Sequence, residues 1–151
     1  MAADPTVTTS CAAPEHRQFD FWVGTWDVFF AAGGPLAGRN RIELVHGGCT
    51  LLESWEGASG FRGNSFSWFE PREALWRQLW RDSSGLTLNL SGGLADGRMR
   101  MFAVTHEGAT PIYNRITWTP SGADELRHQW ETSRDWGERW TMDYDLLYRR
   151  A

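Results

Sequence analysis

Residues 126–132 read Leu-Arg-His-Gln-Trp-Glu-Thr, with a charged or amide side chain at every second position from Arg127. Successive side chains of a β-strand point to opposite faces, so Leu126, His128 and Trp130 share one face. The other face carries an arginine, a glutamine and a glutamate, which a buried interior does not tolerate without partners. The stretch therefore predicts a half-buried strand whose His128 and Trp130 face inward.

Segments of the same kind follow one another along the rest of the chain. Gly, Pro, Asp and Asn separate them at intervals of roughly 8–12 residues, which is typical of β-sandwiches and β-barrels. One separating stretch, from Gly92-Gly93 to Asp96-Gly97, is predicted to be a turn. The predicted strands are Thr25–Ala31, Arg39–His46, Thr50–Glu56, Gly63–Glu70, Leu75–Asp82, Leu86–Ser91, Arg98–Thr105, Ile112–Thr119, Glu125–Thr132 and Glu138–Tyr148.

No segment between these strands is long enough for the crossover helix that parallel strands require, so neighbours are expected to pair antiparallel. Closing the sheet removes the exposed edges that ten sequential strands would otherwise leave. We therefore predict an all-β fold, a closed antiparallel up-and-down barrel of about ten strands. At most two short helices are expected, one of them a turn at Pro14–Phe19. Residues 1–14 are expected to be a flexible tail and residues 15–151 a single domain.

The composition excludes several classes of function. The chain has 151 residues, a net charge of −4, ten tryptophans and no lysine. Without lysine, no side-chain amine can form a Schiff base. The arginines are scattered along the chain, and only Arg149 and Arg150 are adjacent, which argues against a nucleic-acid partner. No apolar run approaches the roughly 20 residues of a membrane-spanning helix.

The N-terminal residues bear on where in the cell the protein is expected. Residues 1–10 show neither the charged start nor the apolar centre of an export signal. We expect a cytoplasmic protein, or a periplasmic or secreted one if a signal peptide has been removed.

The same alternation assigns an inward face to the other strands. Tryptophans gather on this face with a few polar groups, which is how small-molecule sites are usually built. A barrel of about ten strands can enclose more space than side chains fill, so a cavity is favoured over a packed core. The candidate ligand-binding residues are Trp55, Trp76, Gln78, Trp80, His128 and Trp130. The last predicted strand adds an inward series of Trp140, Met142, Tyr144, Leu146 and Tyr148.

These residues favour a protein, monomeric or homodimeric, that binds a small hydrophobic or aromatic molecule. An alternative is an isomerase, cyclase or hydrolase in which Glu53 and His128 perform acid–base chemistry, since burial moves the pKa of such groups towards neutrality. A second alternative is a haem-binding barrel with His128 as the iron ligand. No other cofactor and no metal site are expected, because no two histidines have the spacing of a metal-binding pair.

Three further residues leave alternatives open. Cys11 and Cys49 lack the spacing of a zinc site or a redox motif. They are either two inert thiols or, in an oxidising compartment, a disulfide. Arg115 is either an exposed strand charge or a cation available to an anionic ligand, and exposure is slightly favoured.

The stretch Phe19-Asp20-Phe21-Trp22-Val23-Gly24-Thr25-Trp26-Asp27-Val28 resembles the opening of a bacterial lipocalin-like family of unknown function. Further resemblance lies in residues 49–57, 76–82, 115–120, 129–133 and 146–150. The resemblance implies a calycin-type barrel in which the Phe-Trp-Val-Gly-Thr-Trp stretch, residues 21–26, plugs or flanks one end. It also implies an exported protein with a disulfide between Cys11 and Cys49, because family members often carry a signal and both cysteines. The early Gly-x-Trp is distantly similar to that of nitrobindin-type haem barrels.

Overall fold

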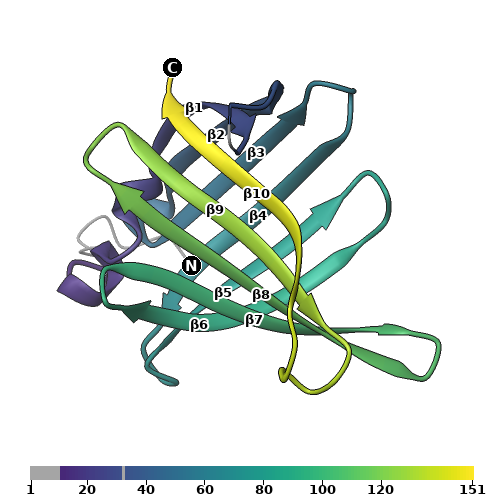
Figure 1. Cartoon of the computed structure of the whole chain (residues 1–151). Helices are drawn as coiled ribbons and strands as arrows, with labels where there is room; N and C mark the ends of the chain where they lie inside the picture. Colours follow the sequence, from purple (N-terminus) through teal and green to yellow (C-terminus); the bar gives the residue numbers. More distant parts are fainter. Residues whose placement is uncertain (1–10, 32) are drawn as a thin grey trace.

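The computed structural model describes residues 11–31 and 33–151 and shows ten strands wound into one closed barrel (Figure 1). Each strand pairs antiparallel with its neighbours in sequence, and β1 pairs with β10 to close the sheet. The predicted all-β, closed antiparallel up-and-down barrel is thereby confirmed. The strands are β1 (Gly24–Phe30), β2 (Leu36–Val45), β3 (Thr50–Gly57), β4 (Arg62–Glu70), β5 (Leu75–Asp82), β6 (Thr87–Ala95), β7 (Arg98–Glu107), β8 (Thr110–Ser121), β9 (Glu125–Ser133) and β10 (Thr141–Arg150).

Three short 3-10 turns accompany the strands in the described residues, one more than predicted. The turn η1 (Pro14–Arg17) lies in the stretch predicted to be helical, η2 (Asp20–Trp22) follows directly after that stretch, and η3 (His46–Gly48) joins β2 to β3. Of the predicted tail, residues 1–10 lie outside the described residues, whereas Cys11 is disulfide-bonded and Pro14 begins η1. None of the described helices has the length and apolar character needed to cross a membrane.

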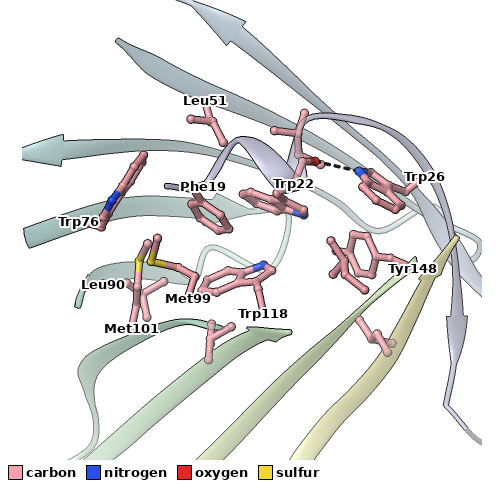
Figure 2. Close-up of a cluster of buried hydrophobic side chains, with 14 of the residues drawn as sticks. Phe19, Trp22, Trp26, Leu51, Trp76, Leu90, Met99, Met101, Trp118 and Tyr148 are labelled. Atoms are coloured by element: carbon pink, nitrogen blue, oxygen red, sulfur yellow. Dashed lines mark hydrogen bonds between the residues drawn. The ribbon is translucent and has the colours of Figure 1, made fainter. Parts of the chain in front are cut away.

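The segment 14–22 closes one end of the barrel and is called the plug below. Phe19 and Trp22 are fully buried, and their rings stack with centroids 4.8 Å apart. Phe19 also meets Trp118 of β8 edge-on at 5.1 Å (Figure 2). Trp26 of β1 donates its Nε1 hydrogen to the carbonyl oxygen of Trp22 over 2.8 Å. Of the stretch that the resemblance expected to plug or flank one end, Phe21 and Trp22 therefore belong to the plug, whereas Gly24, Thr25 and Trp26 begin β1.

Arg150, at the end of β10, connects the closure of the barrel to the plug. Its Nη1 donates to the carbonyl of Val23, and its Nε donates to the carbonyl of Ala123, each over 2.8 Å. Its guanidinium group lies 4.2 Å above the Trp26 ring, close enough for a cation–π interaction. The Arg150 side chain thus holds Val23, which lies between the plug and β1, against the last strand.

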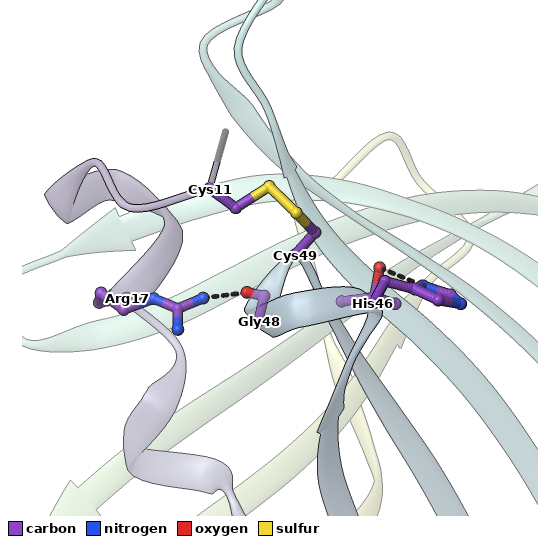
Figure 3. Close-up of a disulfide and its surroundings, with 6 residues drawn as sticks. Cys11, Arg17, His46, Gly48 and Cys49 are labelled. Carbon is purple, nitrogen blue, oxygen red and sulfur yellow. Dashed lines mark hydrogen bonds between the residues drawn. A yellow bond between two sulfur atoms is a disulfide. The ribbon is translucent and has the colours of Figure 1, made fainter. Parts of the chain in front are cut away.

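A disulfide between Cys11 and Cys49 ties the chain just before the plug to the start of β3 (Figure 3). Their Cα atoms are 5.2 Å apart, within the range that a disulfide requires. Beside the bridge, Arg17 of the plug donates a hydrogen bond to the carbonyl of Gly48 (Figure 3). Of the two interpretations left open by the sequence, the structure contains the disulfide.

The predicted inward series on the last strand is wrong at its first two members. β10 begins at Thr141, and its pairing with β9 shifts between Met142 and Tyr144. Such a bulge adds one unpaired residue and reverses the side-chain alternation. Trp140 therefore lies outside the barrel, with the Arg115 guanidinium 4.0 Å above its ring. Met142 is largely exposed as well.

The turn predicted at Gly92-Gly93 is also wrong, because both glycines lie within β6. Gly92 pairs with Trp76 on one side and with Met101 on the other. A methyl group on Gly92 would overlap the backbone of β7, so glycine here permits close approach of a neighbouring strand. The chain reverses only at the far end of the predicted stretch, at Asp96 and Gly97, both with positive φ.

Replacing both cysteines by serine should lower the free energy of unfolding by about 2–4 kcal/mol, because the bridge closes a loop between residues 38 apart in sequence. Denaturant unfolding followed by tryptophan fluorescence measures the loss. A reducing agent should destabilise the native protein by a similar amount and leave the double variant unchanged. Equal stability of the oxidised protein and the variant would contradict the prediction.

Candidate functional site

The barrel contains a cavity of about 530 Å³ that lies between the plug and the opposite end. Its outer rim includes Ser59 and Ser84 from the β3–β4 and β5–β6 connections, which lie at the end away from the disulfide. Trp118 forms the inner end, because it lines the cavity and also packs against the plug. The aromatic lining residues are Phe30, Trp55, Phe61, Trp80, Trp118, Trp130, Tyr144 and Tyr148.

Five of the six candidate ligand-binding residues line this cavity, and one does not. The five are Trp55, Gln78, Trp80, His128 and Trp130, and the candidate acid–base residue Glu53 joins them. Trp76 is fully buried at the plugged end, where its Nε1 donates to Oε1 of Gln18 over 3.1 Å and its ring meets Phe19 edge-on. Strand alternation assigned Trp76 to the correct face. It does not say how deep along the barrel axis a side chain lies, and Trp76 lies at the end that the plug fills.

Glycines make room for two of the cavity tryptophans. A methyl group on Gly63 would overlap the Trp80 ring, and one on Gly38 would come within 2.8 Å of the Trp55 ring. Gly63 also pairs directly with Trp55 across β3 and β4. Large rings can therefore lie flat against the barrel wall, which leaves the centre of the barrel open.

The Trp80 and Trp130 rings are held by hydrogen bonds from their own ring nitrogens. Trp80 Nε1 donates to Oδ2 of Asp82 over 2.9 Å, and Trp130 Nε1 donates to Oδ1 of Asn114 over 3.0 Å. The Trp130 ring also packs against Tyr144, with centroids 5.6 Å apart. Because both indole donors are used within the protein, these two residues offer a ligand mainly the faces of their rings.

A buried polar cluster lies deep in the cavity wall, centred on Glu53. Glu53 Oε2 accepts from Nδ2 of Asn40, and its Oε1 accepts from Oγ of Ser65, each over 2.7 Å. The same Asn40 amide donates to the Tyr148 hydroxyl oxygen over 2.9 Å. Gln78 lies in a separate pair, with its Nε2 donating to Ser67 over 2.9 Å.

Burial has the largest influence on the pKa values of Glu53 and Tyr148 in this cluster. It raises the pKa of Glu53 to about 7, although the hydrogen bonds from Ser65 and Asn40 act in the opposite direction. Burial also raises the pKa of the Tyr148 hydroxyl, and the neighbouring Glu53 adds to that rise. Glu53 is thus the carboxyl group in the cavity that changes charge near neutral pH.

His128 lies in the cavity wall between Trp118, met edge-on at 5.3 Å, and Tyr148, stacked at 6.0 Å. Burial lowers the pKa of His128 to about 4, so the imidazole is neutral at pH 7. Its Nδ1 is buried and has no hydrogen-bond partner among the described residues.

Asp82 places a second carboxylate near the rim of the cavity. Burial opposes its ionisation, but hydrogen bonds from Ser84, Trp80 and the Leu86 backbone outweigh that effect and lower its pKa. No arginine is among the described residues that line the cavity. Arg115 points to the outer face, where it pairs with Glu131 over 2.9 Å. Its side chain is only 21% exposed, so it is a half-buried, paired charge rather than the exposed one that was favoured, and it is not a cation of the cavity.

Sequence reasoning missed the partners of Glu53. Asn40, Ser65 and Tyr148 come from β2, β4 and β10, and only the barrel brings them to β3. A usable signal was present in the fourth strand, where Gly63, Ser65 and Ser67 put small side chains at three successive inward positions before Phe69. Small residues opposite tryptophans and carboxyl groups indicate an interior in which space is left for large or polar neighbours.

Comparison with known protein families and with curated proteins finds no match to this chain. Among residues 11–31 and 33–151, no three His, Cys, Asp or Glu side chains gather in a way that could hold a metal ion. The site is therefore defined by its geometry: a tryptophan-walled barrel cavity with one buried, titrating carboxyl group.

Replacing Glu53 by glutamine should stabilise the protein relative to wild type as pH rises. The folded pKa of about 7 exceeds the ordinary value of 4.5, so between these values the native state holds a proton that the unfolded chain has lost. Wild-type stability therefore falls over this window on account of Glu53, by at most about 3 kcal/mol, and the variant lacks this loss.

Denaturant unfolding of both proteins at pH 4.5, 6 and 8 measures the difference. Comparison at each pH cancels the opposite contribution of His128, whose lowered pKa makes stability rise with pH. Glu56→Gln, at an exposed position on the same strand, is the matched control and should show no such trend. A pH-independent difference between Glu53→Gln and wild type would refute the assignment.

Proposed function

We propose that this protein binds a small, largely apolar or aromatic molecule inside the barrel. The observation that carries the proposal is the cavity of about 530 Å³ with aromatic walls and a few buried polar groups. Sites for small molecules typically measure about 300–1,000 Å³ and combine apolar walls with a small number of placed polar groups. Both features are met here.

Partial exposure of the inward tryptophans argues against a filled core. Trp22, Trp26, Trp76 and Trp118 are fully buried at the plugged end, as in any protein interior. Trp55, Trp80 and Trp130 lie on the same inner surface but stay partly exposed. Apolar rings left uncovered inside a barrel lose dispersion contacts and remain hydrated, so an apolar ligand that covers them is favoured.

Membership of the bacterial lipocalin-like family is proposed alongside this function. Two features support it: the closed up-and-down barrel, and the plug formed by the stretch that carries the resemblance. The disulfide fits the export that the resemblance implied, since disulfides persist in oxidising compartments.

A second candidate function is proton transfer to or from the bound molecule. It is favoured by Glu53, because a carboxyl group with a pKa near 7 is suited to act as general acid and general base at neutral pH. His128 does not fit the role of general acid there, since its pKa of about 4 leaves it without a proton to give. Of the pair, Glu53 is therefore the candidate general acid, whereas the neutral His128 can act only as a weak general base.

The haem alternative is not supported by the residues present. A histidine that ligates iron usually donates its second ring nitrogen to a carboxylate, carbonyl or water. His128 has its Nδ1 buried without such a partner among the described residues. The described lining also contains no arginine to meet the propionate groups.

Trp130→Ala and Trp76→Ala should separate ligand binding from packing. Trp76→Ala removes a fully buried ring from the plugged end and should cost about 3–5 kcal/mol of stability. Trp130→Ala removes a partly exposed cavity ring, so it should cost less stability but weaken the binding of N-phenyl-1-naphthylamine, a neutral fluorescent probe, by about tenfold or more. Melting temperature and probe titration measure both effects.

Native mass spectrometry of protein purified without added ligand provides the independent test. A co-purified organic mass that is absent from Trp130→Ala supports binding in the cavity. The opposite pattern, in which Trp130→Ala loses stability like Trp76→Ala and keeps full probe affinity, would show that the tryptophans are only core.

A further inference from the structure

The charges in the cavity have one sign. Glu53 in the wall and Asp82 near the rim are the carboxyl groups of the lining. The described lining contains no arginine, the chain has no lysine, and His128 is neutral at pH 7. An anionic ligand would therefore bring its charge next to carboxylates in an environment of low polarity, which is unfavourable.

The walls favour positive charge for a second reason. The face of an aromatic ring carries negative electrostatic potential and attracts cations, most strongly in tryptophan. Trp80 and Trp130 line the cavity with their ring nitrogens bonded to Asp82 and Asn114, so they can offer a ligand their π-systems but not their N–H groups. Outside the barrel the protein already makes this contact, with Arg115 lying 4.0 Å over the Trp140 ring.

Glu53 keeps acceptor capacity for a ligand. An ionised carboxylate offers about four lone-pair sites, and Asn40 and Ser65 occupy two of them. No salt bridge to Glu53 exists among the described residues, so its charge has no counter-ion within the protein. A buried carboxylate held by neutral donors alone is a site that a cation can complete.

We propose that the ligand is an organic cation, an ammonium group attached to an apolar aromatic body. This inference rests on the proposed function and names the class of molecule for the same cavity. The aromatic body lies against the Trp55, Trp80 and Trp130 rings, and the ammonium group lies beside Glu53. Asp82 attracts the cation as it enters.

Binding of such a cation should depend on the charge of Glu53. The other titratable groups of the lining are Tyr144 and Tyr148 from β10, His128 from β9 and Asp82 from β5. Tyr148 and His128 stay neutral between pH 5 and 8, and Asp82 stays ionised, since its pKa is lowered. Affinity should therefore rise as Glu53 loses its proton through about pH 7.

Three probes that share one aromatic body test the inference. They are (1-naphthylmethyl)trimethylammonium, its neutral carbon isostere 1-neopentylnaphthalene, and 1-naphthylacetate. None of them changes charge between pH 5 and 8, so any pH dependence belongs to the protein. At pH 8 the cation should bind about tenfold or more tightly than the isostere, and the anion should bind most weakly. Tryptophan quenching and calorimetry measure the three affinities.

Glu53→Gln and pH identify the group responsible. In wild type the preference for the cation should shrink as pH falls to 5, whereas binding of the isostere should stay constant. Glu53→Gln should show the reduced preference at both pH values, and Glu56→Gln should behave as wild type. If Glu53→Gln does not fold, the wild-type comparison of cation and isostere at the two pH values still decides the matter.

The outcomes distinguish the inference from the proposed function on which it rests. Tighter, pH-dependent binding of the cation supports the inference. Equal or tighter binding of the neutral isostere or of the anion overturns the inference and leaves the proposed function standing. Failure of all three probes and of N-phenyl-1-naphthylamine to bind, with no co-purified mass in native spectra, overturns both.

Discussion

The pairing of β1 with β10 is the contact on which the rest of the structure depends. It converts a ten-strand meander into a closed surface with a single interior and two ends. A barrel of this size is wider than its own side chains fill, so the ends must be treated differently. The plug fills one end with Phe19 and Trp22, held by Trp26 and by Arg150 of the closing strand. The other end is not filled by side chains, and the space left there is the cavity.

The open cavity lowers the stability of the fold in two ways, and both support the proposal that it binds a ligand. Partly exposed tryptophans forgo burial that would stabilise the fold. Glu53 is a buried carboxyl group with neutral partners only, and its raised pKa records the desolvation that ionisation requires. Gly38 and Gly63, which make room for two rings, keep the space open rather than filling it. A packed core would serve stability better than this arrangement.

Much of the site followed from alternation within single strands. The pattern at His128 and Trp130, and at Gln78 and Trp80, placed these side chains inward before any pairing was known, and all four line the cavity. The errors have local physical causes. A bulge in β10 reversed the phase before Tyr144, and a glycine required by strand approach was taken for a turn. Neither is visible in one strand, because each is a property of a pair.

The sequence by itself determined that the fold is all-β, which side of most strands faces inward, and that tryptophan and a few polar groups gather there. These are matters of period and turn spacing, which depend on residues close together in the chain. Only the tertiary structure decided depth along the barrel: Trp76 lies against the plug while Trp80, four residues later, lines the cavity. It alone also joined Glu53 to Asn40, Ser65 and Tyr148 from three other strands. Acidity in the cavity arises from those distant neighbours and from burial, so no local pattern of residues could contain it.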